Sequence, residues 1–181
     1  MRTIKAMSPE YAGQVHDVIY DAFCGWRDEE EGKMVCRLVE EIRSKRYYLP
    51  RLELIMVDET DSVLGYAMFS RFHLEGKFED KLLILTPVAV KPEVQRQHIS
   101  RDLIEYGFEQ AKAMGFDAVI VEGNPANYRS RGFVTSAEHG ILAGPNVHLP
   151  AVECLMVKEL VPGALGRIKG LVDYSCYETL T

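Results

Sequence analysis

The part of the sequence best suited to chemistry is QRQHISR, residues 95–101. It follows the apolar, strand-like run LLILTPVAV and begins an amphipathic, helix-like pattern. The start of a helix presents unpaired backbone N–H groups and the positive end of its dipole, and these bind anions such as phosphate. Because the interaction uses backbone, a loop without glycine still qualifies when no side chain blocks the approach. Position alone is a weak signal, since many strand–loop–helix units bind nothing.

Other patterns that carry chemistry are missing. The sequence has no H-x-x-H or H-E-x-x-H spacing for zinc and no G-x-S-x-G elbow for a serine nucleophile. No glycine-rich nucleotide fingerprint follows any strand, which disfavours an α/β nucleotide-binding protein. The four cysteines form no C-x-x-C pair and indicate reduced thiols; they are Cys24, Cys36, Cys154 and Cys176. We therefore expect no metal.

Composition narrows the class of protein. The net charge of −6 over 181 residues argues against general nucleic-acid binding, which needs a basic surplus. No apolar run approaches the roughly 20 residues that cross a bilayer, and the first residues lack the apolar core of a signal peptide. We expect a cytoplasmic protein that binds neither nucleic acid nor membrane.

Hydrophobic periodicity predicts the elements that position the loop. Two helices, over 8–23 and from 28 to the basic residues 43–46, are separated by a break at Gly25. A hairpin over 52–72 follows, and then strands at 81–90, 117–123 and 151–160. A helix over 99–114 connects the strand at 81–90 to the strand at 117–123. Pro87 cannot donate a ladder hydrogen bond, so we expect a bulge or a local opening there. This order predicts one mixed α/β domain.

Two segments carry a resemblance to a known family. TPVAVKPEVQRQHISRDLIEYGFEQAKAMGF and VEGNPANYRSRGF resemble the central motifs of the GNAT superfamily of acyl-CoA-dependent N-acyltransferases. The tail KELVPGALGRIKGLVDY is similar to a poorly characterised bacterial branch. The resemblance covers most of the chain and is weakest in the first fifty and last fifteen residues. It implies a single domain over 1–181, with 161–181 as an extension packed on it. The implied fold is a mostly antiparallel sheet, splayed between its fourth and fifth strands and flanked by helices.

The resemblance implies acetyl-CoA as the acyl donor. Backbone groups of Val88, Ala89 and Val90 would pair with the pantetheine arm, and the N–H groups of 96–100 would hold the pyrophosphate. Arg96 and Arg101 would add charge-assisted contacts. The implied loop residues are Gln95, Arg96, Gln97, His98, Ile99, Ser100 and Arg101. Asn127 would contact the pantetheine or serve as a plain turn residue.

The loop departs from the family pattern at two positions. His98 and Ser100 stand where the pattern has glycine, and glycine or alanine. Ser100 is small, keeps its N–H and can cap the helix. The His98 side chain would turn aside or donate a hydrogen bond to phosphate; otherwise the loop has lost CoA binding.

The resemblance places Tyr128 as the general acid that protonates the CoA sulfur, and packing against cofactor or core is its structural alternative. The N–H of Val88 would stabilise the oxyanion. The strand that ends in VAV has no carboxylate, so the general base stays open. The candidates are Glu122, His73, Glu79 and a water chain.

The acceptor would be a primary amine of a small molecule or a protein. By resemblance it enters between residues 24–31 and 143–150. The acidic residues 28–31 would draw a cationic amine or simply favour a helix start. Many relatives are dimers, so a homodimer is possible. The competing interpretation is a catalytically silent CoA-binding module.

Overall fold

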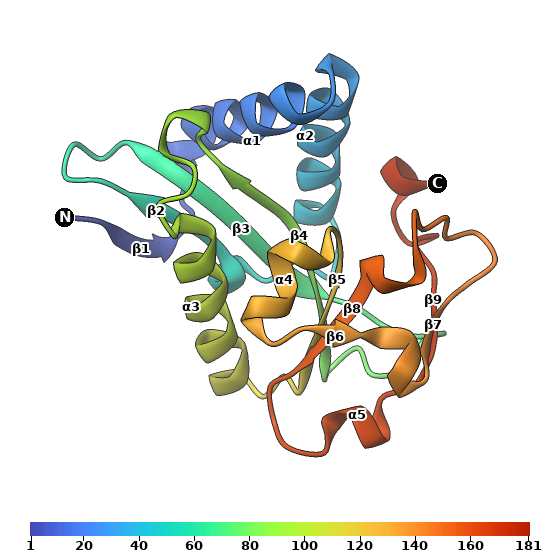
Figure 1. The fold of residues 1–181 in the computed structure, drawn as a ribbon. Helices are drawn as coiled ribbons and strands as arrows, with labels where there is room; N and C mark the ends of the chain where they lie inside the picture. Colours follow the sequence, from blue (N-terminus) through green and yellow to red (C-terminus); the bar gives the residue numbers. More distant parts are fainter. The chain divides into compact units, whose positions relative to one another are not determined.

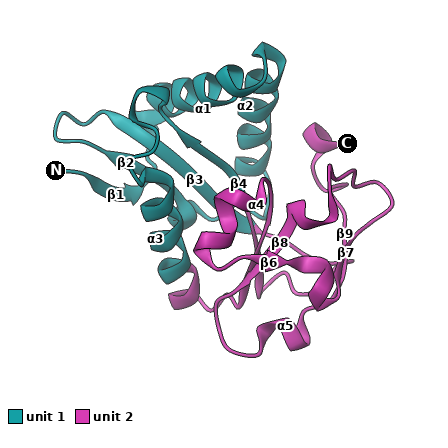
Figure 2. Cartoon of the chain, viewed as in Figure 1, with its two compact units in different colours: residues 1–70, 86–110 teal, residues 71–85, 111–181 magenta.

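The computed structural model describes residues 1–181, and the chain divides into two compact units (Figures 1 and 2). The first unit contains residues 1–70 and 86–110, and the second contains residues 71–85 and 111–181. Strand β4 (Leu82–Val90) and helix α3 (Ile99–Ala113) each contribute to both units. The single domain expected from the sequence stays a prediction.

The elements follow the predicted order with additions at both ends. Before β4 the chain forms β1 (Thr3–Ala6), α1 (Ala12–Trp26), α2 (Glu29–Arg43), β2 (Glu53–Val57) and β3 (Val63–Arg71). After α3 it forms β5 (Ala118–Glu122), α4 (Pro125–Tyr128), β6 (Val134–Thr135), β7 (Ile141–Ala143), β8 (Leu155–Glu159), α5 (Ala164–Arg167) and β9 (Gly170–Val172).

The main sheet has seven strands in the order β1-β2-β3-β4-β5-β8-β6, and β7 and β9 form a separate parallel pair. The pairs β1–β2, β2–β3, β5–β8 and β6–β8 are antiparallel, whereas β4 and β5 are parallel. This confirms the expected fold class, a mixed α/β protein with a mainly antiparallel sheet flanked by helices.

The opening between β4 and β5 is visible in the ladder of the second unit. Their paired residues run from Leu82 and Ala118 to Ile84 and Ile120, and the pairing ends there. Strand β4 nevertheless continues to Val90. The opening therefore begins before Pro87, and β4 runs through that proline. The peptide bond between Thr86 and Pro87 is cis.

In the first unit, a glycine lets α3 approach β3 closely. A Cβ built on Gly65 would lie 2.5 Å from Cγ2 of Ile99, the first residue of α3. Farther along the same pair, Phe69 and Phe108 meet edge to face with ring centroids 6.1 Å apart. Any side chain at position 65 would push the start of α3 away, so this contact fixes where the helix begins.

The opposite face of the sheet carries a buried acid on β2, the neighbour of β3. Glu53 on β2 is fully buried and accepts hydrogen bonds from the Tyr66 hydroxyl and from Nε of Arg43, both at 2.8 Å. Nη2 of Arg43 and the hydroxyl of Tyr48 also donate to it. A buried carboxylate is stable only when it is paired and hydrogen-bonded in this way. The cluster joins α2 to β2 and β3.

Two local predictions need correction. Strand β1 was not expected; it pairs antiparallel with β2, from Thr3 opposite Val57 to Ala6 opposite Leu54. Helix α1 continues through Gly25, and the break falls at Arg27 and Asp28. The side chain of Asp28 caps α2 by accepting from the N–H of Glu31 at 2.9 Å.

The second unit has its own core. Its buried apolar residues come from the start of β4, from β5 and β8, and from the C-terminal segment; they are Phe72, Leu74, Leu82, Ile84, Ala118, Ile120, Ile141, Leu155, Val157, Ala164, Ile168 and Val172. The C-terminal residues 161–181 thus contribute to this core through α5 and β9. No helix is both long and apolar enough to cross a membrane.

Candidate active site

The loop before α3 holds two residues in the left-handed backbone region. The φ angle is +61° at Arg96 and +63° at His98. This region costs most residues about 1–2 kcal/mol, and glycine avoids that cost. Histidine enters it more readily than most side chains do. Glycine at position 98 in the family pattern is therefore explained by backbone conformation, and this chain adopts the conformation without it.

Helix α3 begins directly after the loop. Its first helical bond runs from the N–H of Asp102 to the carbonyl of His98 at 3.0 Å, so His98 occupies the N-cap position. The N–H groups of Ile99, Ser100 and Arg101 therefore have no acceptor within the helix. Ser100 is the second residue of the helix, so the expected cap by its hydroxyl is wrong. Alternating left-handed residues and a helix start together form a concave nest of N–H groups that suits an anion.

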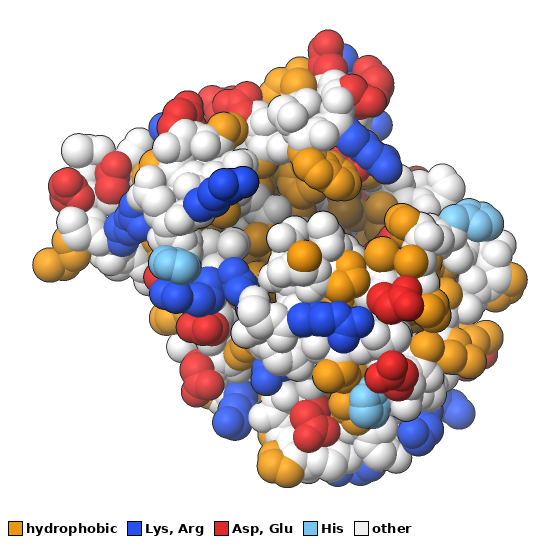
Figure 3. All heavy atoms as spheres, in the orientation of Figure 1, with side chains coloured by type: hydrophobic (Ala, Val, Ile, Leu, Met, Phe, Trp, Pro, Cys, Tyr) orange, Lys and Arg blue, Asp and Glu red, His pale blue; other side chains and the backbone are white.

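The side chains of the loop leave this backbone open to solvent. Gln95, Arg96, Gln97 and His98 are exposed, and the side chains of Arg96 and His98 make no hydrogen bond or ion pair. Lys and Arg side chains gather over the N-terminal end of α3 (Figure 3). Of the two arginines expected to reach phosphate, Arg101 is engaged by its neighbour Asp102 at 3.0 Å, so Arg96 is the cation without a partner.

A third arginine beside the loop was not foreseen. Nη1 of Arg2 donates to the carbonyl oxygen of Gln97 at 3.3 Å, and Nη2 donates to the Gln97 side-chain oxygen. Arg2 precedes β1, a strand that the sequence did not reveal, so no local pattern placed it near residue 97.

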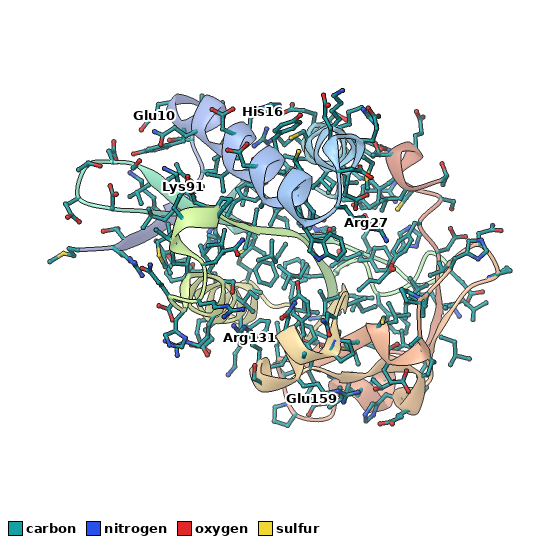
Figure 4. All side chains as sticks on the ribbon, turned by 45° about the horizontal axis from the view of Figure 1, so that its top comes forward. Glu10, His16, Arg27, Lys91, Arg131 and Glu159 are labelled. Atoms are coloured by element: carbon teal, nitrogen blue, oxygen red, sulfur yellow. The ribbon has the colours of Figure 1, made fainter.

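The end of β4 supplies the residues expected to meet the pantetheine arm. Ala89 is buried, while Val88 and Val90 are half-buried. Lys91, labelled in Figure 4, follows directly, and its N–H donates to the carbonyl of Leu64 on β3 at 2.9 Å. The chain then turns through Pro92–Val94 into the loop. Residues 88–90 and 95–101 all belong to the first unit.

Tyr128 and Asn127 belong to the second unit, on the short helix α4. Asn124 caps this helix by accepting from the N–H of Ala126 at 3.0 Å. The Tyr128 ring meets Phe133 edge to face, with centroids 5.7 Å apart. It also lies on Gly123, where a Cβ would come within 2.6 Å of its Cε2 atom. Asn127 is exposed, and its N–H donates to the carbonyl of Asn124 at 2.9 Å, as in a turn.

The environment of Tyr128 keeps its hydroxyl protonated. Burial raises the pKa of Tyr128 to about 12, and the nearby charge of Arg131, labelled in Figure 4, opposes this only weakly. At neutral pH the hydroxyl is a hydrogen-bond donor.

The candidate bases have different surroundings. Glu122, the last residue of β5, is exposed and accepts a 2.6 Å hydrogen bond from the Tyr174 hydroxyl. Nδ1 of His73 accepts from the N–H of Gly76 at 3.0 Å. Glu79 is half-buried in the loop before β4.

The acids that follow α1 are explained by the helix they begin. Asp28 is the N-cap of α2, Glu29 pairs with Lys33 at 2.8 Å, and Glu31 lies 3.7 Å from Arg27. Trp26 beside them is 69% exposed. Residues 24–31 belong to the first unit and residues 143–150 to the second, and an acceptor entrance between them stays a prediction.

None of the four cysteines forms a disulfide, and all four are half-buried. No cluster of three or more histidine, cysteine or acidic side chains is arranged to hold a metal ion.

Comparisons with known proteins identify the family and the fold. Residues 8–137 match the sequence model of the Acetyltransferase (GNAT) family. The chain is 30% identical over 146 residues to the uncharacterized N-acetyltransferase YhbS of Escherichia coli K12, which covers 80% of this chain and 83% of that protein.

Two solved structures share the fold. The structure superposes on a crystal structure of Escherichia coli YhbS in complex with CoA with a TM-score of 0.83 and 24% identity, over 96% of this chain and 89% of that one. A GNAT family acetyltransferase from Brucella melitensis, in complex with acetyl-CoA, gives a TM-score of 0.66 at 24% identity over 90% of each chain. The chain belongs to the GNAT acetyltransferase family.

Proposed function

We propose that this protein transfers an acetyl group from acetyl-CoA to a primary amine of a small molecule or a protein. The observation that carries the proposal is the left-handed, solvent-open loop at Arg96 and His98, which leads directly into α3. Solved relatives in complex with CoA or acetyl-CoA support the choice of donor.

The residues before and within the start of α3 fit a pyrophosphate. Its oxygens accept from the backbone N–H groups of residues 96–100, and the free guanidinium of Arg96 adds charge. Arg101 joins only if it leaves Asp102. The backbone of Val88, Ala89 and Val90 pairs with the pantetheine arm along the part of β4 beyond its ladder with β5. Asn127 contributes a further contact to that arm.

The chemistry is direct attack of a neutral amine on the thioester carbonyl. The N–H of Val88 stabilises the oxyanion. Tyr128 donates its hydroxyl hydrogen to the sulfur as the C–S bond breaks. Because the Tyr128 pKa of about 12 lies above the value of about 8.5 for a thiol, complete proton transfer to a free thiolate would be uphill. The hydroxyl therefore acts while the sulfur is still leaving.

Thermal-shift titration tests the donor site. Acetyl-CoA is expected to raise Tm in a concentration-dependent way, and ATP and NAD are not. No stabilisation by any CoA ester would remove the donor from the proposal.

CoA release with a panel of primary amines tests the enzyme. Tyr128→Phe is expected to lower kcat by about 10²-fold, within the usual range for loss of a general acid, while acetyl-CoA still raises Tm. Tyr106→Phe is the matched control, since Tyr106 is an exposed tyrosine on α3. Binding without release by any amine would instead identify a silent CoA-binding module.

A further inference from the structure

The end of β5 lies beyond its ladder with β4. Pairing to β4 stops at Ile120, so Val121 and Glu122 pair only with Met156 and Leu155 of β8. Glu122 is the one acid in this stretch of the strand, and its side chain is exposed. A carboxylate therefore stands on the part of β5 that has no ladder with β4.

The C-terminal segment holds this carboxylate in place. The Tyr174 hydroxyl donates to Oε2 of Glu122 at 2.6 Å, across 52 residues of sequence. The half-buried Tyr174 ring lies 6.2 Å from Phe72, centroid to centroid. Burial, followed by the charge of Glu122, raises the pKa of Tyr174 well above its usual range. Tyr174 is thus a fixed donor, and Oε1 of Glu122 has no hydrogen-bond partner.

The same strand end carries the proposed acid. Gly123 follows Glu122 directly and supports the Tyr128 ring, which leaves no room for a side chain at position 123. Glu122 and Tyr128 are therefore linked within the second unit: Glu122 is bonded to Gly123, and the Tyr128 ring packs on Gly123.

His73 is poorly suited to the same role. Its Nδ1 accepts from a backbone N–H, so in the neutral ring the proton sits on Nε2. Neither nitrogen then offers a lone pair to an amine. Glu79 lies in the loop before β4 and not on β5, the strand that leads to Tyr128.

We propose that Glu122 is the general base of the acetyl transfer and that Tyr174 is its positioning residue, an assignment that rests on the proposed function. The amine nitrogen forms a bond to the thioester carbonyl carbon, and the carbonyl electron pair moves to oxygen. The Glu122 carboxylate takes the proton from this nitrogen, which becomes acidic once the C–N bond forms. The electron pair then returns, the C–S bond breaks, and Tyr128 supplies the sulfur's proton. A proton passes from Glu122 through water to Tyr128, so the products are the amide and the CoA thiol.

The first test compares Glu122→Gln with wild type, using the amine of the panel that gives the fastest CoA release. The amide keeps the shape and the hydrogen bond from Tyr174 but does not accept the proton. We expect kcat to fall by about 10²-fold or more, with an unchanged KM and thermal shift for acetyl-CoA. Glu138→Gln, which removes an exposed acid of the same unit, is the matched control and should retain wild-type rates.

The second test is chemical rescue. Glu122→Ala leaves room for a small carboxylate, so added formate should restore kcat at least tenfold in this variant and in no other. Tyr174→Phe should lower kcat by about tenfold with unchanged KM for acetyl-CoA, because it frees the carboxylate to move without changing donor binding.

The outcomes separate this assignment from the proposed function. Wild-type turnover in Glu122→Gln, or a folded, acetyl-CoA-binding Glu122→Ala that formate does not rescue, would overturn Glu122 as the base while acetyl transfer stands. A fall in acetyl-CoA affinity equal to the fall in kcat in Tyr174→Phe would overturn the positioning role. A wild-type protein that acetyl-CoA does not stabilise and that releases no CoA would overturn both proposals together.

Discussion

The ring of Tyr128 rests on the backbone of Gly123, so close that a Cβ at position 123 would lie 2.6 Å from its Cε2 atom. This contact joins the end of β5 to helix α4. The position of the Tyr128 hydroxyl therefore depends on the absence of a side chain one residue beyond the strand.

Gly123→Ala should displace Tyr128. A shift of about 1 Å in a catalytic group can lower the rate by 10²-fold, so we expect kcat for CoA release to fall by roughly 10- to 100-fold with unchanged affinity for acetyl-CoA. Gly166→Ala is the control, because a Cβ there meets no atom within 4 Å. Equal rates for the two variants would show that the ring contact does not set the rate.

His98→Gly should stabilise the protein. Glycine removes the left-handed cost of about 1–2 kcal/mol from the folded state. It also raises the entropy that the chain loses on folding, at a cost of about 0.5–1 kcal/mol, so the free energy of unfolding should rise by about 0.5 kcal/mol. His98→Ala gains nothing, since alanine keeps the left-handed strain. Urea denaturation measures the stability of both variants.

The same two variants test whether His98 contacts the cofactor. Since the exposed His98 side chain has no partner, acetyl-CoA affinity should be the same in both variants. A loss of affinity in both would mean that the imidazole contacts phosphate.

Arg43→Met should destabilise the first unit strongly. It leaves the carboxylate of Glu53 fully buried without its cation, a change that costs about 3–5 kcal/mol in comparable sites. Adding Glu53→Gln should return part of that loss, because no buried charge then remains. Lys33→Met, which breaks exposed pairs with Glu29 and Glu30, should change the free energy of unfolding by less than about 1 kcal/mol. A double variant as unstable as the sum of the single ones would contradict the coupling.

Tyr128 should ionise near pH 12. Burial raises its pKa to about 12, above the value of about 10 for an exposed tyrosine. The difference between the ultraviolet titrations of wild type and Tyr128→Phe should therefore appear near pH 12.

The same pKa shift makes the stability depend on pH. Below pH 10 the Tyr128 hydroxyl is protonated in both folded and unfolded states. Between pH 10 and pH 12 the unfolded state binds fewer protons, so the Tyr128 contribution to stability is lost as the pH rises through this window. A tyrosine signal at pH 10 that Tyr128→Phe removes would refute the burial effect.

The sequence predicts elements well where the pattern is local and repeated. The helical spacing of residues 99–114 and the hairpin over 52–72 appear in the structure as α3 and the β2–β3 pair. Strand β1 was missed because four residues with one large aliphatic side chain, Ile4, carry little periodicity. Its place is set by pairing with β2, about fifty residues away. Helix α1 passes through Gly25 because no neighbouring atom and no left-handed angle interrupts it there.

The loop of the candidate site was predicted by position, but its conformation was not. The resemblance identified His98 as a departure from the family's glycine. The φ angle shows that this histidine must adopt a left-handed backbone conformation. The bonds from Arg2 to Gln97 and from Tyr174 to Glu122 have no local signal, since each joins residues far apart in the chain. Hydrogen bonds between distant residues form when the chain packs into its tertiary structure, and local sequence patterns do not reveal them.

The left-handed backbone at Arg96 and His98 bears on how members of this family are recognised. At position 98 the family pattern has glycine, and this chain holds a left-handed backbone angle there with histidine. A search that requires glycine at position 98 would pass over this chain, whereas one that compares backbone angles ahead of a helix would retain it.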